Sequence, residues 1–504
     1  LSAVEDTSAV TAIILRSTRY LKFTDMQKDI NQLLALFQGP KGENSELFKQ
    51  LLLRVVDSHN NLRASSFTED ESLFTHQVTN EKLEKELADF LEMMGENLPY
   101  FHPRYSAQML KDPTIPSILG YLAFIMSNPN NHAWEGGPVT TQMELDVVDI
   151  LLKMCGFTTG WGHLASGGSL ANQEALWAAR DYYGNGTVFF SEVSHYSWKR
   201  ICKILAIDSF EEIPVDGNFR MNPKALEDAL KRSAKPLMVV ANFGSTGAGT
   251  ADDLAAILEL KNKYNFHLHI DAAYGGFFRA CVLDDNYDLL PFDPLGNITR
   301  HSYDQLKLFA EADSITIDPH KQGFMQYGAG AVIYKDEALR EPLSNTAPYT
   351  YHKTDKPNIG MFSLEGSRPG AMAAACYLTY KVIPPVASGL GKLLDLSLAS
   401  AKKFYELIEN SENYRNFNHP DLDICTFYVK GDSTQEINRR SLSVYQKLSV
   451  ENPEAEFIIS KFVTSPEIAA RAIPNLVNLD NENFSALRSV FMKHWNALDD
   501  FRYV

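Results

Sequence analysis

The sequence predicts an α/β protein in which a mostly parallel β-sheet is flanked by helices, with a helical segment before it and a small α+β domain after it. Between residues 160 and 340, apolar β-branched runs alternate with helical patterns, as in parallel sheets. Residues 25–97 show helical spacing of apolar residues, and residues 386–504 mix both patterns. A chain of 504 residues also exceeds the usual size of one core, so several subdomains are expected.

The N-terminal segment, residues 1–100, is expected to be helical. From Asp25 to Asn97 the sequence is mostly polar, with apolar residues at helical spacing around Leu51. Such amphipathic helices normally cover a core or a partner. The apolar run at residues 9–15 is too short for a membrane span and follows acidic residues, so neither a signal peptide nor a membrane anchor is predicted.

The central domain, residues 101–385, carries the predicted sheet. A helix is expected from about Thr140 to Met154, where apolar residues form one stripe. The predicted strands are Thr187–Glu192, Pro236–Gly244, Phe266–Asp271, Ser314–Ile317 and Gly330–Tyr334. Too few residues separate the last two strands for a crossover helix, so the last strand is expected to run antiparallel to its predecessor.

The C-terminal domain, residues 386–504, is expected to be a smaller α+β unit. Helical patterns occur in the alanine-rich segment after Gly370 and again over Leu393–Glu409. The elements predicted beyond them are strands at Ile424–Val429, Glu456–Val463 and Leu487–Met492, and a helix over Ser433–Leu448.

Composition argues against several classes of function. The formal net charge of −16 and the pI of 5.3 argue against nucleic acid or an anionic membrane as a partner. The cysteines lie without close pairs, which fits reduced thiols in a cytoplasmic protein and predicts no metal site. They are Cys155, Cys202, Cys281, Cys376 and Cys425.

Two of the predicted strands end in residues that carry chemistry. The run from Ser314 leads into Asp318-Pro319-His320-Lys321, and an earlier run ends in Asp271, followed by Ala272 and Ala273. A lysine held at a strand end can bind an aldehyde through its ε-amine, and a buried carboxylate can keep a pyridine nitrogen protonated. Ala273 is small enough to lie against one face of a flat ring. The pair of strand ends therefore predicts pyridoxal 5'-phosphate as the cofactor, with Lys321 and Asp271 as its ligands.

Two further segments would complete such a site. Gly168 and Ser169 open a strong helix pattern, and the unpaired N–H groups of a helix start bind phosphate. Ser169 is expected to cap this helix and to contact phosphate oxygens. His195 follows an apolar run and could stack on the open face of the ring. Taken alone, the first segment also fits an ordinary helix start, and the second a surface histidine.

In their order along the chain, five motifs resemble the group II amino-acid decarboxylases, which are fold-type I pyridoxal phosphate enzymes, and among these the bacterial tyrosine decarboxylases most. The motifs are Gly-Gly-Ser-Leu-Ala-Asn at 167–172, Ser-His-Tyr-Ser-Trp at 194–198, Gly-Ser-Thr-Gly-Ala-Gly-Thr at 244–250, His-Ile-Asp-Ala-Ala-Tyr-Gly-Gly at 269–276 and Asp-Pro-His-Lys at 318–321. The likeness runs from roughly residue 100 to the end of the chain. It implies an enzyme that converts an L-amino acid to the corresponding amine and CO2.

The resemblance implies roles for individual residues. Lys321 would carry the cofactor, Asp271 would pair with its ring nitrogen and His195 would stack on the ring. Thr246 would contact the phenolic oxygen of the cofactor. The phosphate ligands would be Gly168, Ser169 and His320.

The resemblance also implies a homodimer with shared active sites. Within Leu364–Gly370, Ser367 would approach the cofactor of the neighbouring subunit. The N-terminal helices would wrap around that subunit.

The residue that donates the proton replacing CO2 is left open by the sequence. Tyr327 follows Lys321 by six residues, where the tyrosine decarboxylases also carry tyrosine. Tyr349 and Tyr351 lie in a polar stretch between prolines, which suits a lid that excludes water. Any of the three could instead pack at the base of a loop. Arg488 could orient the substrate or tie the small domain to the large one.

The substrate is left open as well. Unlike the tyrosine decarboxylases, the chain has no long insertion before the histidine motif, and it diverges from them after Phe462. Tyrosine or another aromatic amino acid is the first candidate, and aspartate or glutamate the second. Sphingosine-phosphate-lyase-like enzymes share the Gly366–Gly370 motif, but no counterpart of their membrane segment is seen in this sequence. A catalytically silent homologue is disfavoured because Lys321, Asp271 and His195 are all retained.

Overall fold

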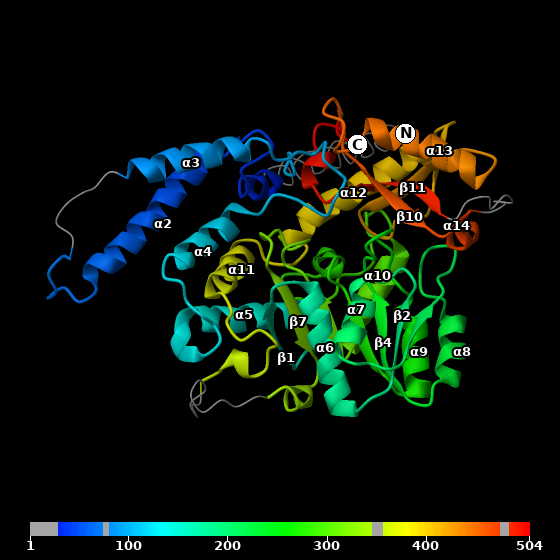
Figure 1. The fold of residues 1–504 in the computed structure, drawn as a ribbon, viewed down its shortest axis with the longest axis horizontal. Coiled ribbons are helices and arrows are strands. Elements are labelled where there is room, and N and C mark those ends of the chain that lie inside the picture. The colour runs from blue at the N-terminus through cyan, green and yellow to red at the C-terminus, as the bar shows by residue number, and fades with distance from the viewer. Residues whose placement is uncertain (1–28, 74–79, 345–355, 474–482) are drawn as a thin grey trace, which may run out of the picture.

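A seven-stranded sheet forms the centre of the protein (Figure 1). The structure is a computed structural model, and it describes residues 29–73, 80–344, 356–473 and 483–504. The strand order is β1-β7-β6-β5-β4-β2-β3, and β7 runs in the direction opposite to the other six strands. The strands are β1 (Trp161–Ala165), β2 (Thr187–Ser191), β3 (Phe210–Ile213), β4 (Pro236–Asn242), β5 (His267–Asp271), β6 (Ser314–Ile317) and β7 (Gly330–Tyr334).

The five strands expected in this region are confirmed, and their ends lie within two residues of those predicted. The antiparallel direction of β7 is also confirmed, because the link from Ile317 to Gly330 leaves no room for a crossover helix. The sequence does not predict β1 or β3. β1 contains Gly162 in its interior, and β3 is a short edge strand that carries Glu211 and Glu212.

Alternate residues of the strands pack on opposite faces of the sheet. In β4, Val239 and Ala241 belong to one apolar cluster, and Met238 and Val240 belong to another. The second face is covered by α6 (Gly168–Tyr183) and α7 (Ser197–Ile204). The first face is covered by α5 (Pro138–Cys155), α8 (Pro223–Arg232), α9 (Leu254–Tyr264), α10 (Arg300–Lys307) and α11 (Gly370–Val382), and α4 (Ile115–Ile125) packs on α11.

The predicted helix over Thr140–Met154 is confirmed as α5, and its ends follow from local chemistry. Pro138 stands at the first helical position, where its missing N–H group costs nothing. Gly156 ends the helix with a φ of 80°, a left-handed conformation that favours glycine. Short 3₁₀ helices occupy Trp134–Gly136, Gly276–Val282, Leu308–Glu311, Glu337–Arg340, Ile359–Met361 and His494–Ala497.

A second, four-stranded antiparallel sheet lies in the C-terminal part of the chain, in the order β10-β11-β9-β8. The elements of this part of the chain are α12 (Leu390–Glu409), β8 (Tyr414–Asn416), β9 (Ile424–Val429), α13 (Thr434–Lys447), β10 (Ser460–Thr464), α14 (Pro466–Ala472) and β11 (Phe484–Val490). The predicted α12, β9, α13 and β11 are confirmed, while β10 begins four residues later than expected. The sequence does not predict β8, which has only three residues, or α14.

Two helices near the N-terminus, α2 (Ser45–Ser65) and α3 (Glu81–Met94), project from the body of the protein at the left of Figure 1. Neither helix has a buried residue. Among the residues that the structure describes, no helix is both long and apolar enough to cross a membrane.

Candidate active site

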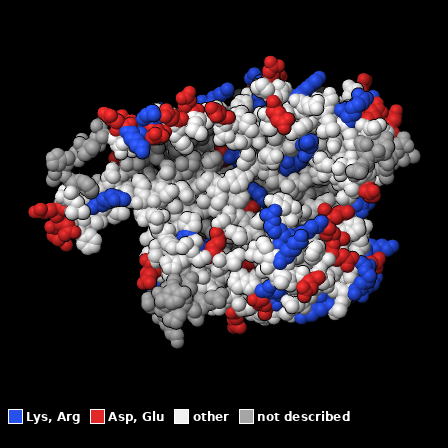
Figure 2. Space-filling model, viewed as in Figure 1, with Lys and Arg blue, Asp and Glu red and all other residues white. Residues whose placement is uncertain are grey.

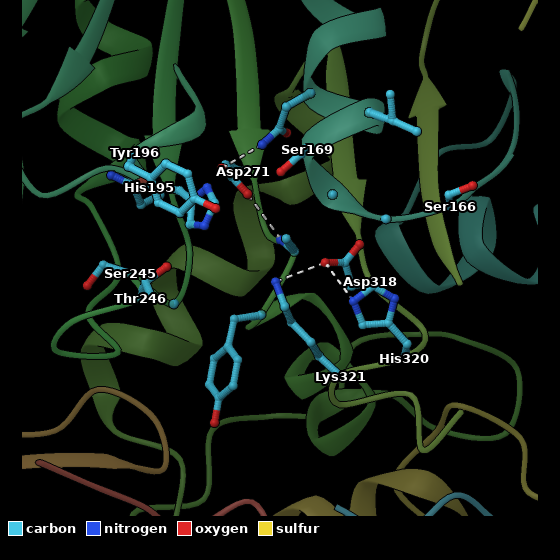
Figure 3. Close-up of a pocket in the computed structure, with 18 residues that line it drawn as sticks. Ser166, Ser169, His195, Tyr196, Ser245, Thr246, Asp271, Asp318, His320 and Lys321 are labelled. Atoms are coloured by element: carbon cyan, nitrogen blue, oxygen red, sulfur yellow. Dashed lines mark hydrogen bonds and ion pairs between the residues drawn. The ribbon is translucent and has the colours of Figure 1, made fainter. Parts of the chain in front are cut away.

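A cavity of about 370 Å³ opens where β2, β4, β5 and β6 end and α6 begins (Figure 3). Ligands of α/β proteins usually bind at this edge, outside the carboxyl ends of parallel strands. The lining includes eight of the residues predicted from sequence as cofactor ligands, namely Gly168, Ser169, His195, Thr246, Asp271, Ala273, His320 and Lys321.

Asp271 is the last residue of β5 and is nearly buried. Its Oδ2 accepts hydrogen bonds from Nδ2 of Asn172 at 2.8 Å and from Nε1 of Trp198 at 3.0 Å. Its Oδ1 accepts a weak bond from the amide of Ala273 at 3.4 Å. Asp271 therefore presents a carboxylate of fixed orientation to the cavity.

Lys321 lies in the turn after β6, with its Nζ 2.9 Å from Oδ2 of Asp318. Burial lowers the pKa of the Lys321 amine, but the charge and hydrogen bond of Asp318 and the charge of Asp271 outweigh burial and raise that pKa overall. The amine is therefore held as a cation and must lose a proton before it can act as a nucleophile.

The phosphate end of the predicted site is formed by the start of α6. The amides of Gly168 and Ser169 are among the first N–H groups of this helix, which have no intrahelical partners and face anions favourably. A Cβ on Gly168 would lie 2.9 Å from Oδ2 of Asp318 and 3.0 Å from Cβ of Ala273, so a side chain there would clash. The prediction that Ser169 caps α6 is wrong, because Gly167 occupies the N-cap and Ser169 lies inside the first turn.

Two histidines lie on opposite sides of the cavity (Figure 3). Nδ1 of His195 accepts a hydrogen bond from the amide of Ser197 at 3.3 Å, and Nδ1 of His320 accepts one from the amide of Ala329 at 3.2 Å. Burial is the main cause that lowers the pKa of both imidazoles. Both rings are therefore neutral at neutral pH, with Nε2 as the donor. Thr246 is exposed and lies on the same side as His195.

Of the three candidate tyrosine proton donors, Tyr327 lies among the described residues, and it is not part of the cavity lining. The hydroxyl of Tyr327 donates to the carbonyl of Met109 at 2.8 Å, and its ring stacks on His320 with the ring centroids 4.5 Å apart. Tyr349 and Tyr351 lie outside the described residues.

Two other predicted residues also lie away from the cavity. Ser367 is exposed, and its hydroxyl accepts a hydrogen bond from Nδ2 of Asn130 at 3.3 Å. Arg488 is buried on β11, and its Nη1 donates to the carbonyl of Ala107 and to Oγ of Ser460, both at 3.1 Å. The sequence leaves two roles open for Arg488, which are to orient the substrate or to tie the small domain to the large one. These contacts favour the second role.

A buried network ties the lysine turn to the C-terminal sheet. Asp423 accepts hydrogen bonds from the hydroxyl of Tyr274 at 2.6 Å and from Nε2 of Gln322, the residue after Lys321, at 2.7 Å. Nζ of Lys111 donates to Oε1 of Gln322 at 2.6 Å. These contacts hold the turn from two sides.

Three residues that take part in the site are not predicted as ligands from the sequence. Asn172 and Trp198 stand in the recognised motifs, yet only the fold shows that both reach Asp271. Asp318 stands three residues before Lys321, and this short spacing is a usable signal for an ion pair.

These residues fit pyridoxal phosphate on structural grounds. The cavity combines a glycine-lined helix start for a phosphate, an amine for an aldehyde and a carboxylate for a ring nitrogen. Among the described residues, Oδ1 of this carboxylate has one weak partner, the amide of Ala273. Among the described residues, no group of three or more His, Cys, Asp or Glu side chains could hold a metal ion.

Comparisons with known proteins agree with this chemistry. Residues 71–283 match the family model described as the pyridoxal-dependent decarboxylase conserved domain. The chain is 29% identical to the L-tyrosine decarboxylase of Levilactobacillus brevis over 538 aligned positions, which cover 86% of this chain and 85% of that protein. It is 28% identical to the aspartate 1-decarboxylase of Aliivibrio fischeri, with 82% and 83% covered.

A solved structure supports the fold independently. The TDC of Oryza sativa, with PLP and tryptamine, aligns with a TM-score of 0.69 at 14% identity, covering 99% of this chain and 97% of that one. At this identity the likeness concerns the fold alone. The matched domain and the relatives support one conclusion: the chain carries a pyridoxal-dependent decarboxylase domain over residues 71–283 and is similar over most of its length to amino-acid decarboxylases.

Proposed function

We propose that this protein removes the α-carboxyl group of an aromatic L-amino acid, with tyrosine as the first substrate to test. The observation that carries this proposal is the joint placement of Lys321 and Asp271 at the ends of adjacent parallel strands, facing one cavity with a phosphate-binding helix start. The resemblance to tyrosine decarboxylases over most of the chain supports the substrate.

Each ligand has a distinct task in the proposed reaction. When bound, pyridoxal phosphate would supply a site for the electron pair that departing CO2 leaves on the substrate carbon. Asp271 would hold a proton on the ring nitrogen, and Lys321 would hold the aldehyde until the substrate amine takes its place. The ion pair with Asp318 fixes the position of the Lys321 amine. His195 presents a neutral ring at the cavity, where it would stack on the cofactor.

The charges around the cavity favour an uncharged substrate side chain. Among the described residues that line it, Lys321 is the only lysine or arginine. This lysine is already paired with Asp318. A side-chain carboxylate of aspartate or glutamate would therefore lack a cationic partner in this part of the chain, whereas a phenol or indole ring needs none.

The proposed function is tested by CO2 release from a panel of L-amino acids with the cofactor-loaded protein. Tyrosine, phenylalanine, tryptophan, aspartate and glutamate form the core of the panel. A kcat/KM for an aromatic substrate at least about 100-fold above that for aspartate is expected, because a buried unpaired carboxylate costs several kcal/mol. Preference for an acidic substrate would overturn the aromatic assignment, and no release from any substrate would overturn the decarboxylase.

We expect Tyr327→Phe to slow amine formation, if Tyr327 donates the proton to the substrate carbon. A lost general acid typically lowers the rate by about 10²- to 10⁴-fold. Loss of the hydroxyl should also raise the share of an aldehyde by-product, formed when the proton reaches the cofactor instead. Cofactor binding should survive, because the stacking on His320 needs only the ring. Product ratios from Tyr327→Phe, Tyr349→Phe and Tyr351→Phe, measured separately, identify the donor, and unchanged ratios in all three would move the role to His195 or water.

We also propose that the protein works as a homodimer. The projecting helix α3 exposes an apolar stripe at helical spacing, and α2 likewise has no buried residue. The stripe consists of Leu83, Leu87, Phe90, Leu91 and Met94, which are 49–64% exposed. An exposed helix pair of this kind is not stable alone in water, and a second copy of the chain is the proposed cover. Figure 2 shows charged side chains of both signs on the projecting helices. The surface beneath these helices carries few charges in the same view.

Phe90→Glu is expected to weaken the dimer. Losing an apolar anchor at an interface costs about 2 kcal/mol or more, which raises the dimer dissociation constant roughly 30-fold. Lys85→Glu places the same side chain elsewhere on α3 and serves as the control. Light scattering across a dilution series measures both. A wild-type protein that is fully active as a monomer would contradict the proposal.

Complementation tests whether the dimer shares its active sites. Chains with Lys321→Ala and chains with Ser367→Trp should each be inactive, and mixing them should restore one intact site per hybrid dimer. No recovery after proven subunit exchange would exclude sharing through Ser367.

A cytoplasmic location is proposed from the cysteines. All five are free thiols in the structure, and four are buried. Cell fractionation tests this placement.

A further inference from the structure

A chain of buried polar side chains runs behind Asp271, away from the cavity. His267 and His269 share with Asp271 the face of β5 that turns toward α6, because alternate strand residues point the same way. Ser314 on β6 lies 2.7 Å from Nε2 of His267 and 2.8 Å from Nδ1 of His269, measured from its Oγ. Nε2 of His269 lies 3.0 Å from Oδ1 of Asn172, whose Nδ2 donates to Asp271. All five residues are at most 9% exposed.

The direction of every hydrogen bond in this chain is determined. Since the amide nitrogen of Asn172 donates to the carboxylate of Asp271, its oxygen faces His269 and can only accept. His269 must therefore carry its proton on Nε2. Burial lowers the pKa of His269 to about 3, so the ring is neutral and its Nδ1 accepts from the hydroxyl of Ser314. The oxygen of Ser314 then accepts from Nε2 of His267, whose Nδ1 has no partner in the structure.

All donors in the chain thus point toward Asp271. The last of them, Nδ2 of Asn172, shares Oδ2 of Asp271 with Nε1 of Trp198. Oδ1 is left to the cavity, with one weak bond from Ala273. The other ionisable groups whose charge acts on or near Asp271 are Lys321, Asp318, His195 and His269. The two donors on Oδ2 therefore fix the orientation of the carboxylate.

We propose that Asn172 is a positioning residue for the reaction, fixed by His269 and Ser314, which holds the carboxylate of Asp271 by its Oδ2 so that its Oδ1 would meet the protonated ring nitrogen of the cofactor. The inference rests on the proposed pyridoxal phosphate chemistry and adds residues to which no role in it is assigned. Without the His269 contact, the Asn172 amide could turn its oxygen toward Asp271, and two acceptors would face each other. The hydrogen bonds from Ser314 to His269 and from His269 to the oxygen of Asn172 exclude that orientation.

The buried polarity of this region argues against simple packing as its purpose. Leu268 and Ile270, on the other face of β5, belong to the apolar core. Replacing a buried polar chain by apolar side chains of similar size is often neutral or stabilising. Polar residues at His267, His269 and Ser314 therefore need a reason beyond stability, and the carboxylate at the end of the chain supplies it.

The test uses variants that change the hydrogen bonds of these buried side chains with little change in side-chain volume. Asn172→Asp replaces the donor facing Asp271 by an acceptor of the same size. Ser314→Ala breaks the chain two links away from Asp271 and leaves the cavity untouched. Thr316→Val is the matched control, because Thr316 is buried on the same strand and its hydroxyl has no partner.

Two readouts that need no substrate are measured at neutral pH. The first is the dissociation constant for pyridoxal phosphate, from absorbance titration of the apoprotein. The second is the ¹⁵N chemical shift of the ring nitrogen in protein loaded with ¹⁵N-labelled cofactor, which reports directly whether that nitrogen is protonated.

In Asn172→Asp we expect the cofactor dissociation constant to rise roughly 10- to 100-fold, because a hydrogen bond to a charged group is lost. The ring nitrogen signal should move toward the unprotonated position. Ser314→Ala should shift both readouts in the same direction by less, and Thr316→Val should match the wild type. A wild-type nitrogen shift in Asn172→Asp, or in Ser314→Ala if the first variant does not fold, refutes this inference alone. Failure of the wild-type protein to bind the cofactor would refute both this inference and the proposed function.

Discussion

Replacing Lys321 with alanine is expected to lower the decarboxylation rate by at least about 1000-fold, equivalent to about 4 kcal/mol of transition-state stabilisation. Lys321 is the only lysine among the described residues that line the cavity, and its Nζ is held 2.9 Å from Asp318. Another lysine therefore cannot take its place from this part of the chain. In the proposed reaction Lys321 would hold the cofactor aldehyde until the substrate amine replaces it, so loss of Lys321 would remove both the anchor and the exchange.

The covalent assignment is checked separately from the rate. Borohydride should fix the cofactor to the wild-type protein, and peptide mapping should find it on Lys321. Lys321→Arg preserves a cation beside Asp318 but cannot bind the aldehyde in this way, so it should be as inactive as Lys321→Ala while keeping the fold. Lys335→Ala, at an exposed lysine beyond β7, is the control. Recovery of the label on any other lysine would contradict the assignment.

The strands that sequence predicts well are those that lie inside the sheet. β6 and β7 are buried along their whole length, so their apolar runs stand out from the helical segments around them. β3 lies at the edge of the sheet and β8 has three residues, and neither needs a continuous apolar run. Their positions depend on tertiary contacts that local sequence does not record.

The same distinction applies to the site. The positions of Asp271 and Lys321 at the cavity can be predicted because Asp271 ends an apolar strand, Lys321 follows one closely, and both side chains are rarely buried without a purpose. Asn172 and Trp198 lie on helices and look like ordinary helix residues until the fold brings them to Asp271. Ser169 has the residue type of a cap, yet Gly167 takes that position because the backbone before α6 is extended there. Ser367 lies away from this chain's cavity, so its predicted role depends on the proposed partner subunit.

Replacing Asp271 with alanine is expected to lower turnover by roughly 10²- to 10⁴-fold, because removing one partner of a buried ion pair costs about 3–5 kcal/mol. The change also leaves Nδ2 of Asn172 and Nε1 of Trp198 without their acceptor. Some cofactor should remain bound, since Lys321 and the start of α6 do not depend on this carboxylate. The defect should therefore appear mainly in kcat at full cofactor occupancy.

Asp271→Asn separates the charge of this side chain from its hydrogen bonds. The amide oxygen can still accept from Asn172 and Trp198, so folding and cofactor occupancy should stay closer to the wild type than in Asp271→Ala. A neutral amide cannot stabilise a proton on the ring nitrogen, so turnover should fall nearly as far as in Asp271→Ala. Turnover and cofactor occupancy, measured together on both variants, separate the effect of the charge from that of the hydrogen bonds. Near-normal turnover of Asp271→Asn at full occupancy would show that hydrogen bonding is sufficient, and the ion pair with the ring nitrogen would then have no part in the rate.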